Sequence, residues 1–496
     1  MTVSVNSAAL VGIDAVFIEV ETRICAGVSY FIVGLAGEAV KESLFRVESA
    51  ITTCGFDMPR QKILISLAPA GIRKEGAVFD LPVALSILAA SGQLAPEKME
   101  DFLFTGELSL KGKLRPVKGA LSVAIEARKA GFKSLVVPKE NANEAAMVSD
   151  LAVFGFETLT EVVEFLNRTT KAEKVVIKTR ELFAKDDGLY AADFSDVRGQ
   201  ENVKRALEIM AAGGHNGLMI GPPGTGKTML ATRLPGILPP LSLQEALETT
   251  RIYSVAGQLD SIGLMTQRPF RSVHHTASDI ALVGGGPVAM PGEISMAHHG
   301  VLFMDELPEF KRKVLEVLRQ PLEERQITIS RASYSVNFPA NFVLLAAMNP
   351  CPCGFFRHPD RKCTCTPQVI RIYRSKISGP LLDRIDLHIG VGPADMKITK
   401  TENSATIRKR VIAARNIQMG RAGVCNALMD TRMVREFCRL GKTEEEVLNQ
   451  AMAQYKLSAR SYERILKVAR TAADLAAAPQ ITLVHLAEAI SYRQIK

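Results

Sequence analysis

Strand-like and helix-like hydrophobic patterns alternate along the first 168 residues. Apolar runs such as AVFIEVETRI, YFIVGLA, KILISLAP, FLFTGEL and SLVVPK are separated by amphipathic stretches. Apolar residues at every second position, or in short continuous runs, are typical of strands, whereas a spacing of three or four residues is typical of helices. Residues 1–168 are therefore predicted to form an α/β domain.

Two further regions follow a polar stretch. Residues 169–192 are mostly polar or charged and show no repeated period, which predicts a linker. A second α/β domain is expected at 193–395, and residues 396–496 lack strand-like runs but show helical periodicity, as in SARSYERILKVARTAADLAAA. A chain of 496 residues is long enough for each domain to bury its own core.

The composition is that of an ordinary water-soluble protein. Hydrophobic residues make up 47% and charged residues 23% of the chain. No apolar run reaches the ~18 residues that a membrane span needs. The opening stretch MTVSVNSAALVGIDAVFIEVETRI has no basic segment before its apolar residues, so it does not read as a signal peptide. We expect a cytoplasmic protein without a membrane partner.

The most specific motif is a glycine-rich loop between a strand and a helix. GLMIGPPGTGKTML contains G-x-x-x-x-G-K-T after an apolar strand, the context that a nucleotide-binding P-loop requires. The backbone N–H groups of such a loop surround phosphates, its lysine reaches the β- and γ-oxygens, and its threonine holds Mg²⁺. A site for ATP and Mg²⁺ is predicted at Gly221, Pro222, Pro223, Gly224, Thr225, Gly226, Lys227 and Thr228.

Two other apolar strands end in polar side chains that suit the same site. GVLFMDELPEF ends in Asp305, which would join the Mg²⁺ shell, and Glu306, which would polarise the attacking water. FVLLAAMNP ends in Asn349, whose amide could hold that water against the γ-phosphate. Taken alone, Asn349 would be read as a turn residue before Pro350.

Three arginines are candidates for stabilising the transition state. SGPLLDRIDLHIG contains Arg384, whose planar guanidinium suits the charge on a transferred phosphoryl group. An ion pair with a neighbouring aspartate is the alternative interpretation of this arginine. Arg460 and Arg464 lie four residues apart on one predicted helix face, and either could reach the phosphates.

Four of the eight cysteines lie in the segment that follows Asn349, NPCPCGFFRHPDRKCTCTPQ. Cys351, Cys353, Cys363 and Cys365 supply four soft ligands, enough for a closed tetrahedral structural Zn²⁺ site. The C-x-C spacing is tighter than the commoner C-x₂-C, so free thiols remain the alternative.

Basic residues gather around these cysteines. The net charge of +9 is spread over a large surface and is weak support for nucleic-acid binding by itself. Between Phe356 and Lys376, however, the only acidic residue is Asp360, and the six basic residues are Arg357, Arg361, Lys362, Arg371, Arg374 and Lys376. This cluster is either a DNA contact or a solvated basic face.

These motifs, in this order, resemble AAA+ ATPases of the helix-2-insert, pre-sensor-1 hairpin group. RPFRSVHHTASDIALVGGG, PGEISMAHHGVLFMDELPEF, LRQPLEERQITISRASYSVNFPANF and KISGPLLDRIDLH are similar to the ComM/YifB family of magnesium chelatase-like proteins, and the similarity covers essentially the whole chain. The resemblance implies sensor 1 at Asn349, an arginine finger acting on a neighbouring subunit at Arg384, and sensor 2 at Arg460. It also implies a homo-oligomeric ring, typically a hexamer.

The same resemblance assigns two pore-lining segments. Residues 250–295 would form the helix-2 insert, and ISRASYSVNFPAN, which contains Arg331, would form a DNA-contacting hairpin. The pairs His274-His275 and His298-His299 are interpreted as pore-loop or packing residues rather than metal ligands, because adjacent side chains point in different directions.

The amino-terminal region has a resemblance of its own. LAPAGIRKEGAVFDLPVALSILAASG and GELSLKGKLRPVKGALSVAIEARKAGF resemble the Lon protease domain, in which a lysine activates a serine nucleophile. Lys118 corresponds to that lysine, but Val83 takes the place of the serine, so proteolysis is not expected. A non-proteolytic copy of this fold occurs in the RadA recombination protein, which favours DNA as a partner.

The predicted fold class is α/β, with a Lon-protease-like (S5-like) domain, an AAA+ P-loop domain and a carboxyl-terminal α-helical lid. The resemblance implies a ring-forming, ATP-driven DNA motor, a helicase for branch migration in recombination. Its expected setting is the integration of imported DNA during natural transformation, with recombination proteins as partners. The alternatives are a metal-insertion motor like magnesium chelatase and an ATP-driven protein remodeller.

Overall fold

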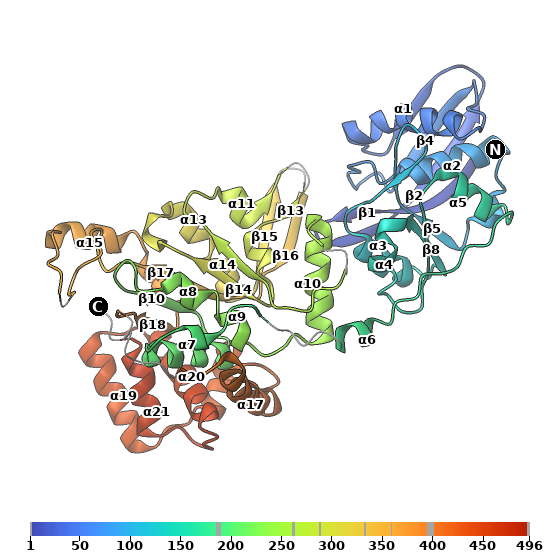
Figure 1. Ribbon diagram of the computed structural model, residues 1–496. Coiled ribbons are helices and arrows are strands. Elements are labelled where there is room, and N and C mark those ends of the chain that lie inside the picture. Colours follow the sequence, from blue (N-terminus) through green and yellow to red (C-terminus); the bar gives the residue numbers. More distant parts are fainter. Residues whose placement is uncertain are drawn as a thin grey trace.

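The computed structural model of the chain contains an amino-terminal α/β part, a central α/β part and a carboxyl-terminal group of helices (Figure 1). It describes residues 2–184, 190–259, 263–286, 289–331, 334–358, 360–393 and 401–493. The predicted fold class is confirmed, since two sheets with helices are followed by a helical region. The domain boundaries given above stay predictions.

A seven-stranded sheet in the order β3-β4-β2-β1-β5-β8-β9 forms the amino-terminal part. Its strands are β1 (Thr2–Val11), β2 (Asp14–Cys25), β3 (Tyr30–Val33), β4 (Lys62–Ala68), β5 (Phe102–Phe104), β8 (Ser134–Pro138) and β9 (Ala152–Phe156). β1 and β2 form a long antiparallel hairpin. In β2, Ile18, Val20 and Thr22 are buried and alternate with less buried glutamates, as a period of two predicts.

Five helices and a small ribbon accompany this sheet. They are α1 (Glu38–Thr53), α2 (Asp80–Ala90), α3 (Ala120–Lys129), α4 (Ala142–Ala145), α5 (Leu159–Leu166), β6 (Glu107–Leu108) and β7 (Leu114–Arg115), with 3₁₀ turns at Pro96–Lys98 and Lys139–Asn141. Helix α2 is buried at almost every position, and Val83 within it is fully buried. A serine at that position would be shielded from any substrate.

The predicted linker contains a short helix, α6 (Thr179–Ala184), which the lack of periodicity did not indicate. Leu182 and Phe183 pack against the apolar cluster formed by α3, α4 and their neighbouring strands. Val175 also forms an isolated antiparallel bridge with Val153 of β9. Part of this polar segment is therefore ordered by packing against the amino-terminal domain.

Five parallel strands in the order β11-β14-β17-β10-β18 form the central sheet. Their bounds are β11 (Phe270–Val273), β14 (Val301–Met304), β17 (Val343–Met348), β10 (Gly217–Ile220) and β18 (Leu387–Gly390). β14 is buried at every position, which explains its uninterrupted apolar sequence. The carboxyl ends of parallel strands share one edge of the sheet, where ligands are commonly bound.

Helices surround the central sheet, and two insertions extend it. The helices are α7 (Glu201–Gly213), α8 (Lys227–Ala231), α9 (Leu234–Ile237), α10 (Leu243–Ala256), α11 (Asp279–Val283), α12 (Glu293–Met296), α13 (Arg312–Val317), α14 (Arg319–Glu324), α15 (Pro367–Ser375) and α16 (Gly379–Leu382). The insertions contain the ribbons β12 (Gly284–Gly285) with β13 (Met290–Pro291) and β15 (Gln326–Arg331) with β16 (Tyr334–Pro339). 3₁₀ turns occur at Phe194–Asp196 and Leu307–Glu309.

The carboxyl-terminal part is helical, as predicted. It comprises α17 (Ser404–Ala422), α18 (Thr431–Phe437), α19 (Lys442–Tyr455), α20 (Ala459–Leu475) and α21 (Leu483–Ser491), with a 3₁₀ turn at Asn426–Leu428. Helix α20 buries one apolar face, including Ile465 and Val468, in a core shared with α7 and the central sheet. This shared core fixes the helices to the sheet.

The amino-terminal part contacts the central part through α10 and the β15–β16 hairpin (Figure 1). Arg251 of α10 lies 2.5 Å from the carboxylate of Asp14. Gly12, in the turn between β1 and β2, has φ +67°, and a Cβ there would overlap Val336 of the hairpin. Glycine at this turn therefore permits both the left-handed backbone and the close approach.

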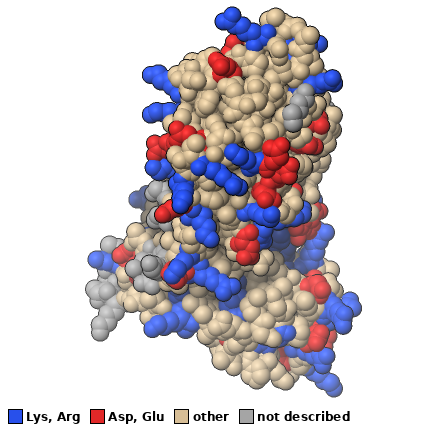
Figure 2. Space-filling view, turned by 90° about the vertical axis from the view of Figure 1, so that its right-hand side faces the viewer, with Lys and Arg blue, Asp and Glu red and all other residues tan. Residues whose placement is uncertain are grey.

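None of the helices that the structure describes is long and apolar enough to cross a membrane. Figure 2 shows the face that lies on the right-hand side of Figure 1, where basic and acidic side chains are interspersed. The net charge of +9 is therefore not gathered into one basic patch on this face.

Candidate nucleotide site and cysteine cluster

The parallel register brings the predicted nucleotide residues to one edge of the central sheet. β10 lies between β17 and β18, and β14 lies on the other side of β17. The P-loop follows β10, Asn349 follows β17, and Asp305 follows β14. Segments that are distant in the sequence thus meet at the carboxyl ends of three strands. They line a cavity of about 420 Å³ formed by Pro223, Gly224, Thr225, Gly226, Lys227, Thr228, Met229, Asp305, Glu306, Met348 and Asn349.

Different structural constraints favour glycine at different positions of the P-loop. Gly224 and Gly226 have φ angles of +77° and +79°, a backbone region that favours glycine. Gly221 has no such angle, but a Cβ there would overlap the carbonyl oxygen of Val391. The loop can therefore follow the path of a phosphate-binding loop between β10 and α8.

Lys227 occupies the centre of this loop. Its Nζ donates to the carbonyl oxygens of Gly221 at 2.9 Å and Pro222 at 2.8 Å, and to Oδ1 of Asn349 at 3.2 Å. Burial lowers the pKa of Lys227, and the carboxylates of Asp305 and Glu306 oppose that shift. The geometry connects the P-loop lysine directly to the tip of β17.

Oxygen ligands suited to Mg²⁺ lie beside the lysine. Thr228 Oγ1 donates to Asp305 Oδ2 at 3.0 Å, and Asp305 Oδ1 accepts the backbone N–H of Glu306 at 2.8 Å. A hydroxyl and a carboxylate at this spacing could share a magnesium ion that also binds phosphates. Glu306 adopts the left-handed conformation with φ +50°, a strained backbone that is typical of functional sites.

His275 contacts the candidate base and was not predicted to lie here. Its Nδ1 is 3.2 Å from Oε2 of Glu306, and its ring packs on that of His274 at 4.0 Å between centroids. Strand β11 ends at Val273 next to β14, so the histidine pair is carried to the nucleotide edge. The interpretation of these histidines as pore-loop or packing residues assumed that adjacent side chains point in different directions. Instead the two rings pack together, and His275 lies beside Glu306 next to this cavity.

The second histidine pair packs against an acidic side chain. His299 Nε2 lies 2.8 Å from Glu248 Oε2, and His298 Nε2 lies 3.6 Å from the same oxygen. His298 Nδ1 accepts the backbone N–H of Asn341 at 3.0 Å, so the neutral ring carries its proton on Nε2. A protonated Nε2 cannot coordinate a metal, which favours the packing interpretation.

Arg384 lies away from the P-loop of its own chain. It precedes β18, whereas the P-loop follows the parallel strand β10, so the length of a strand, roughly 13 Å, separates them along the sheet. Arg384 is 5% exposed and is paired with Glu323 at 2.6 Å. The predicted alternative, an ion pair within the chain, is therefore present, but its partner is Glu323 rather than Asp383 or Asp386.

Arg460 and Arg464 lie on the same side as Arg384. Arg464 donates to the carbonyl oxygen of Arg384 at 3.0 Å and pairs with the buried Asp386. Burial would raise the pKa of Asp386, but Arg464 holds it far below the usual range. Exposed Arg460 adds to the positive field around Glu323. Neither arginine reaches its own P-loop in this structure, because both lie near Arg384 and Glu323, before the amino end of β18.

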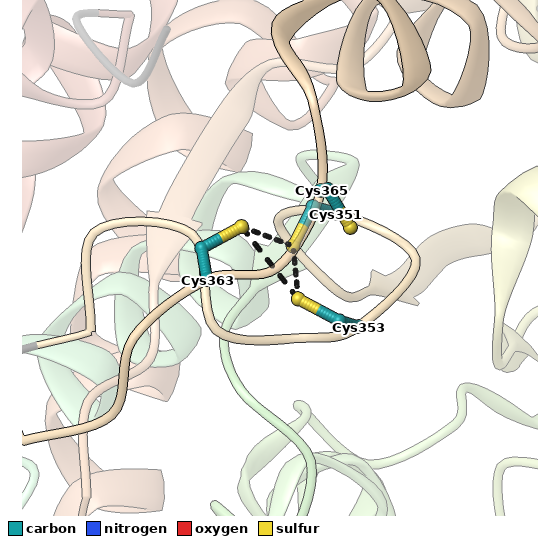
Figure 3. Close-up of side chains that lie close together, drawn as sticks. All are labelled: Cys351, Cys353, Cys363 and Cys365. Atoms are coloured by element: carbon teal, nitrogen blue, oxygen red, sulfur yellow. Dashed lines mark hydrogen bonds between the residues drawn. The ribbon is translucent and has the colours of Figure 1, made fainter.

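The four clustered cysteines converge in space (Figure 3). The Sγ atoms of Cys351 and Cys353 are 3.3 Å apart, and Cys363 Sγ lies 3.7 and 3.6 Å from them. All four Sγ atoms, including that of Cys365, lie within 4.8 Å of one another. A tetrahedral zinc with Zn–S bonds of about 2.3 Å requires S–S separations of about 3.8 Å. The residues therefore fit a structural zinc site.

The local backbone favours a thiolate at one position of this cluster. Backbone N–H groups of Phe355 and Thr364 lower the pKa of Cys353 to about 5. Cys351 is fully buried, whereas the other three are partly exposed. Desolvation and contacts with the sulfurs of Cys353 and Cys351 outweigh a backbone hydrogen bond and raise the pKa of Cys363 to about 12, and they raise that of Cys365 too. Zinc coordination requires deprotonated sulfur, so metal binding would release protons from these thiols.

The cysteine loop packs directly against the nucleotide site. A Cβ at Gly354, which has φ +85°, would overlap Pro223 of the P-loop. Arg374 of α15 donates to the carbonyl oxygen of Pro350 at 3.2 Å. The loop and α15 extend away from the central sheet at the left of Figure 1. A movement of the cysteine loop can therefore displace the P-loop through the direct contact of Gly354 with Pro223.

Basic and aromatic side chains of this loop are paired with one another. Arg361 stacks over Phe355 at 5.1 Å, and Arg357 over Phe356 at 5.4 Å. Arg357, Arg361 and Lys362 are exposed and available to a polyanion. The side chain of Arg331, the hairpin residue predicted to contact DNA, lies outside the described part of the chain.

Comparison with known proteins accounts for this arrangement. The magnesium chelatase subunit ChlI family matches residues 193–399, a ChlI subunit model matches 20–141, and the ChlI carboxyl-terminal model matches 401–493. Competence protein ComM of Haemophilus influenzae is 45% identical over 99% of this chain and 97% of its own length. The chain belongs to the ComM/YifB family. YifB of Salmonella typhimurium is also 45% identical, over 99% of this chain and 97% of its own length.

Two partial similarities bear on other expectations for this family member. Lon protease 1 of Syntrophobacter fumaroxidans is 27% identical over 164 residues, 32% of this chain and 20% of that protein. The DNA repair protein RadA of Listeria monocytogenes is 35% identical over 97 residues, 20% of this chain and 21% of that protein. The expected Lon-like similarity is confirmed.

We expect Glu306→Gln to retain ATP binding but to lower hydrolysis by about 10²–10⁴, the usual contribution of a general base. His275→Ala should lower kcat with little change in KM, because it removes the ring whose Nδ1 lies 3.2 Å from the Glu306 carboxylate. Phosphate release measured over a range of ATP concentrations separates the two constants. His275→Gln, which keeps a polar group, should recover part of the loss.

The comparison variant is His274→Ala, which removes the ring packed on His275 at 4.0 Å but leaves the 3.2 Å His275–Glu306 pair in place, so it should lower kcat less than His275→Ala. Combining His275→Ala with Glu306→Gln should give no further loss, because the two residues act as a unit. A fully additive loss in the double variant would show that His275 does not act through Glu306.

The cysteine cluster predicts about one zinc per purified chain, with Zn–S distances of about 2.3 Å. Replacing Cys353 and Cys365 together by serine should remove the metal, as measured by elemental analysis and X-ray absorption. Replacing Cys25 and Cys54, which are half-buried and lie outside the cluster, should leave it in place. Metal-free wild-type protein, or full zinc in the Cys353 and Cys365 variant, would refute the assignment.

Proposed function

We propose that the chain is an ATPase that binds ATP and Mg²⁺ in the cavity between the P-loop, Asp305 and Asn349. Lys227 and the loop backbone bind the phosphates, and Thr228 and Asp305 hold Mg²⁺. Glu306 orients and polarises the attacking water, and Asn349 positions that water against the γ-phosphate. The observation that carries this proposal is the direct contact of Lys227 with Asn349 beside the Thr228–Asp305 hydrogen bond.

Hydrolysis is proposed to require a neighbouring subunit. Arg384 lies across the sheet from its own P-loop, and Arg460 and Arg464 lie with it. Arginines on that side can serve a nucleotide only in the next copy of the chain, head to tail. A repeated head-to-tail interface closes into a ring, and we propose a hexamer. Arg384 then acts as the finger, and Arg460 as sensor 2, in trans.

The proposed work of the ring is movement along DNA. ComM is named a competence protein and RadA a DNA repair protein, and both are similar to this chain. The exposed basic and aromatic side chains of the cysteine loop suit phosphates and unstacked bases, and Gly354 connects that loop to Pro223. We propose a cytoplasmic branch-migration helicase that integrates imported DNA with recombination proteins.

A metal-insertion motor is the competing function, because the matching family carries the name of magnesium chelatase. An ATP-driven protein remodeller is the other. Neither activity requires DNA to stimulate hydrolysis, whereas a DNA motor does. Fully buried Val83 in place of a serine argues against the proteolytic form of a remodeller.

We expect single-stranded or branched DNA to stimulate ATP hydrolysis by the purified protein several-fold. Replacing Arg357, Arg361 and Lys362 by glutamine should weaken DNA binding and reduce its salt dependence, because fewer counterions are released. ATP binding should persist. A matched variant that changes the exposed residues Arg432, Arg435 and Lys442 should bind DNA normally. Hydrolysis that no DNA stimulates would exclude the DNA motor and leave the alternatives.

The trans arrangement predicts complementation between two inactive proteins. Arg384→Ala should bind ATP but not hydrolyse it, whereas Lys227→Ala should not bind ATP. In mixed rings, an intact P-loop can meet an intact finger, so turnover should reappear as the two are titrated together. Mixing Lys227→Ala with a Lys227→Ala, Arg384→Ala double variant is the control and should stay inactive. If the first mixture also stays inactive in assembled rings, action in trans is wrong.

A further inference from the structure

A second cavity, of about 190 Å³, lies between the base of the central sheet and the carboxyl-terminal helices. It is formed by residues near the amino ends of β14 and β17, at the end of α7 and along α17, so it is distinct from the nucleotide cavity. Its polar side chains are Arg268, Arg325, Arg415, Glu245, His299 and Asn341. Donors therefore greatly outnumber acceptors in its lining.

Glu245, the one acidic side chain of this lining, already has hydrogen-bond and ion-pair partners. Glu245 accepts the backbone N–H of Ser242 at 2.8 Å. It also pairs with Arg268 at 3.2 Å and lies 3.4 Å from His299 Nδ1. Arg268 uses its remaining donors on the carbonyl oxygens of Pro239, Pro240 and His299. The charges of Arg268 and Glu245 thus compensate each other. Arg325 and Arg415, the other two arginines of the lining, are not compensated by Glu245.

Arg325 is the side chain without a charge partner. Within the described part of the chain, its only side-chain hydrogen bond runs from Nη1 to the carbonyl oxygen of Phe342 at 3.2 Å, and no carboxylate forms an ion pair with it, although Asp386 acts on its charge from farther away. Burial lowers the pKa of Arg325. Its backbone has φ +56°, an unusual value for arginine. A guanidinium has five donors, so most of them remain available here.

Arg415 and Asn341 add further donors to the cavity. Arg415 donates through Nε to the carbonyl oxygen of Ala212 at 2.8 Å and through Nη2 to that of Ala211 at 3.0 Å. Its Nη1 makes no hydrogen bond with the residues that the structure describes. The same holds for the side-chain amide of Asn341. Three side chains therefore present unused N–H donors to one space: one lies between α14 and β15, one precedes β17, and one belongs to α17.

A buried charge without a partner is costly, and an anion that accepts several charge-assisted hydrogen bonds removes that cost. We propose that this cavity binds a tetrahedral oxyanion of the phosphate class, held by Arg325, Arg415 and Asn341. The volume would hold several waters at about 30 Å³ each, which leaves room for such an ion. The ligand is either free phosphate or the terminal phosphoryl group of a larger molecule.

An anion bound at this site would lie between the β15–β16 hairpin and the carboxyl-terminal helices. Arg325 immediately precedes β15, and its carbonyl oxygen accepts the N–H of Ala340 at the base of the β15–β16 hairpin. Arg415 belongs to α17 in the carboxyl-terminal part. An anion between them ties the base of the hairpin to those helices. The proposed binding of an anion at this site does not depend on the proposed movement along DNA.

The test is calorimetric titration of inorganic phosphate, without magnesium, into the Lys227→Ala protein, whose P-loop is disabled. Binding at one site per chain is expected. Arg325→Gln and Arg415→Gln, each in that background, should weaken it at least tenfold, as expected for losing a charged hydrogen bond. Arg432→Gln, which changes an exposed arginine of α18, should not. A separate arm with a 5′-phosphorylated dinucleotide distinguishes free phosphate from a larger ligand.

Thermal unfolding provides a second readout. Phosphate should raise the Tm of the Lys227→Ala protein by a few degrees, because it binds the folded state. It should leave the Tm of the Arg325→Gln derivative unchanged. If Arg325→Gln does not fold, Arg415→Gln and Asn341→Leu decide. The proposal is wrong if neither ligand binds, or if binding survives in the arginine variants. A Lys227→Ala, Arg325→Gln protein, in which both sites are disabled, contradicts the nucleotide site instead if it still binds ATP.

Discussion

The parallel pairing of β10, β17 and β14 is the constraint on which the rest of the molecule depends. It makes three segments leave the sheet at one edge, and the N–H of Gly221 bonds the carbonyl oxygen of Met348 at 3.2 Å to hold two of them together. Lys227, which also donates to the carbonyl oxygens of Gly221 and Pro222, then meets Asn349. The cysteine loop starts where β17 ends, so the same strand pairing places this loop beside the P-loop.

Features determined by neighbouring residues could be predicted from the sequence. The G-x-x-x-x-G-K-T loop, the acidic pair after an apolar strand and the four cysteines each carry their chemistry within a short segment. The alternating and helical patterns indicated the fold class for the same reason, since burial repeats at fixed intervals along strands and helices. In the structure, the loop and the acidic pair line one cavity, and the four cysteines form one cluster.

Contacts between distant segments could not be predicted in the same way. His275 meets Glu306 only because β11 pairs with β14, and no local pattern encodes that neighbour. The path of α20 puts Arg464 beside Asp386 rather than beside the P-loop. The apolar residues that order α6 are ordinary in a polar stretch until the surface that they cover is known.

The contact of Gly12 with Val336 has a consequence for how load is carried. Val336 and Phe338 are buried in the cluster that Val11 and Ile13 join, so separating hairpin and turn would expose them at about 1.5–3 kcal/mol for each side chain. A force on the hairpin is therefore passed to β1 and β2, whose ten paired positions share it along an antiparallel ladder. The amino-terminal domain can therefore support the hairpin mechanically, a role that does not require a catalytic nucleophile.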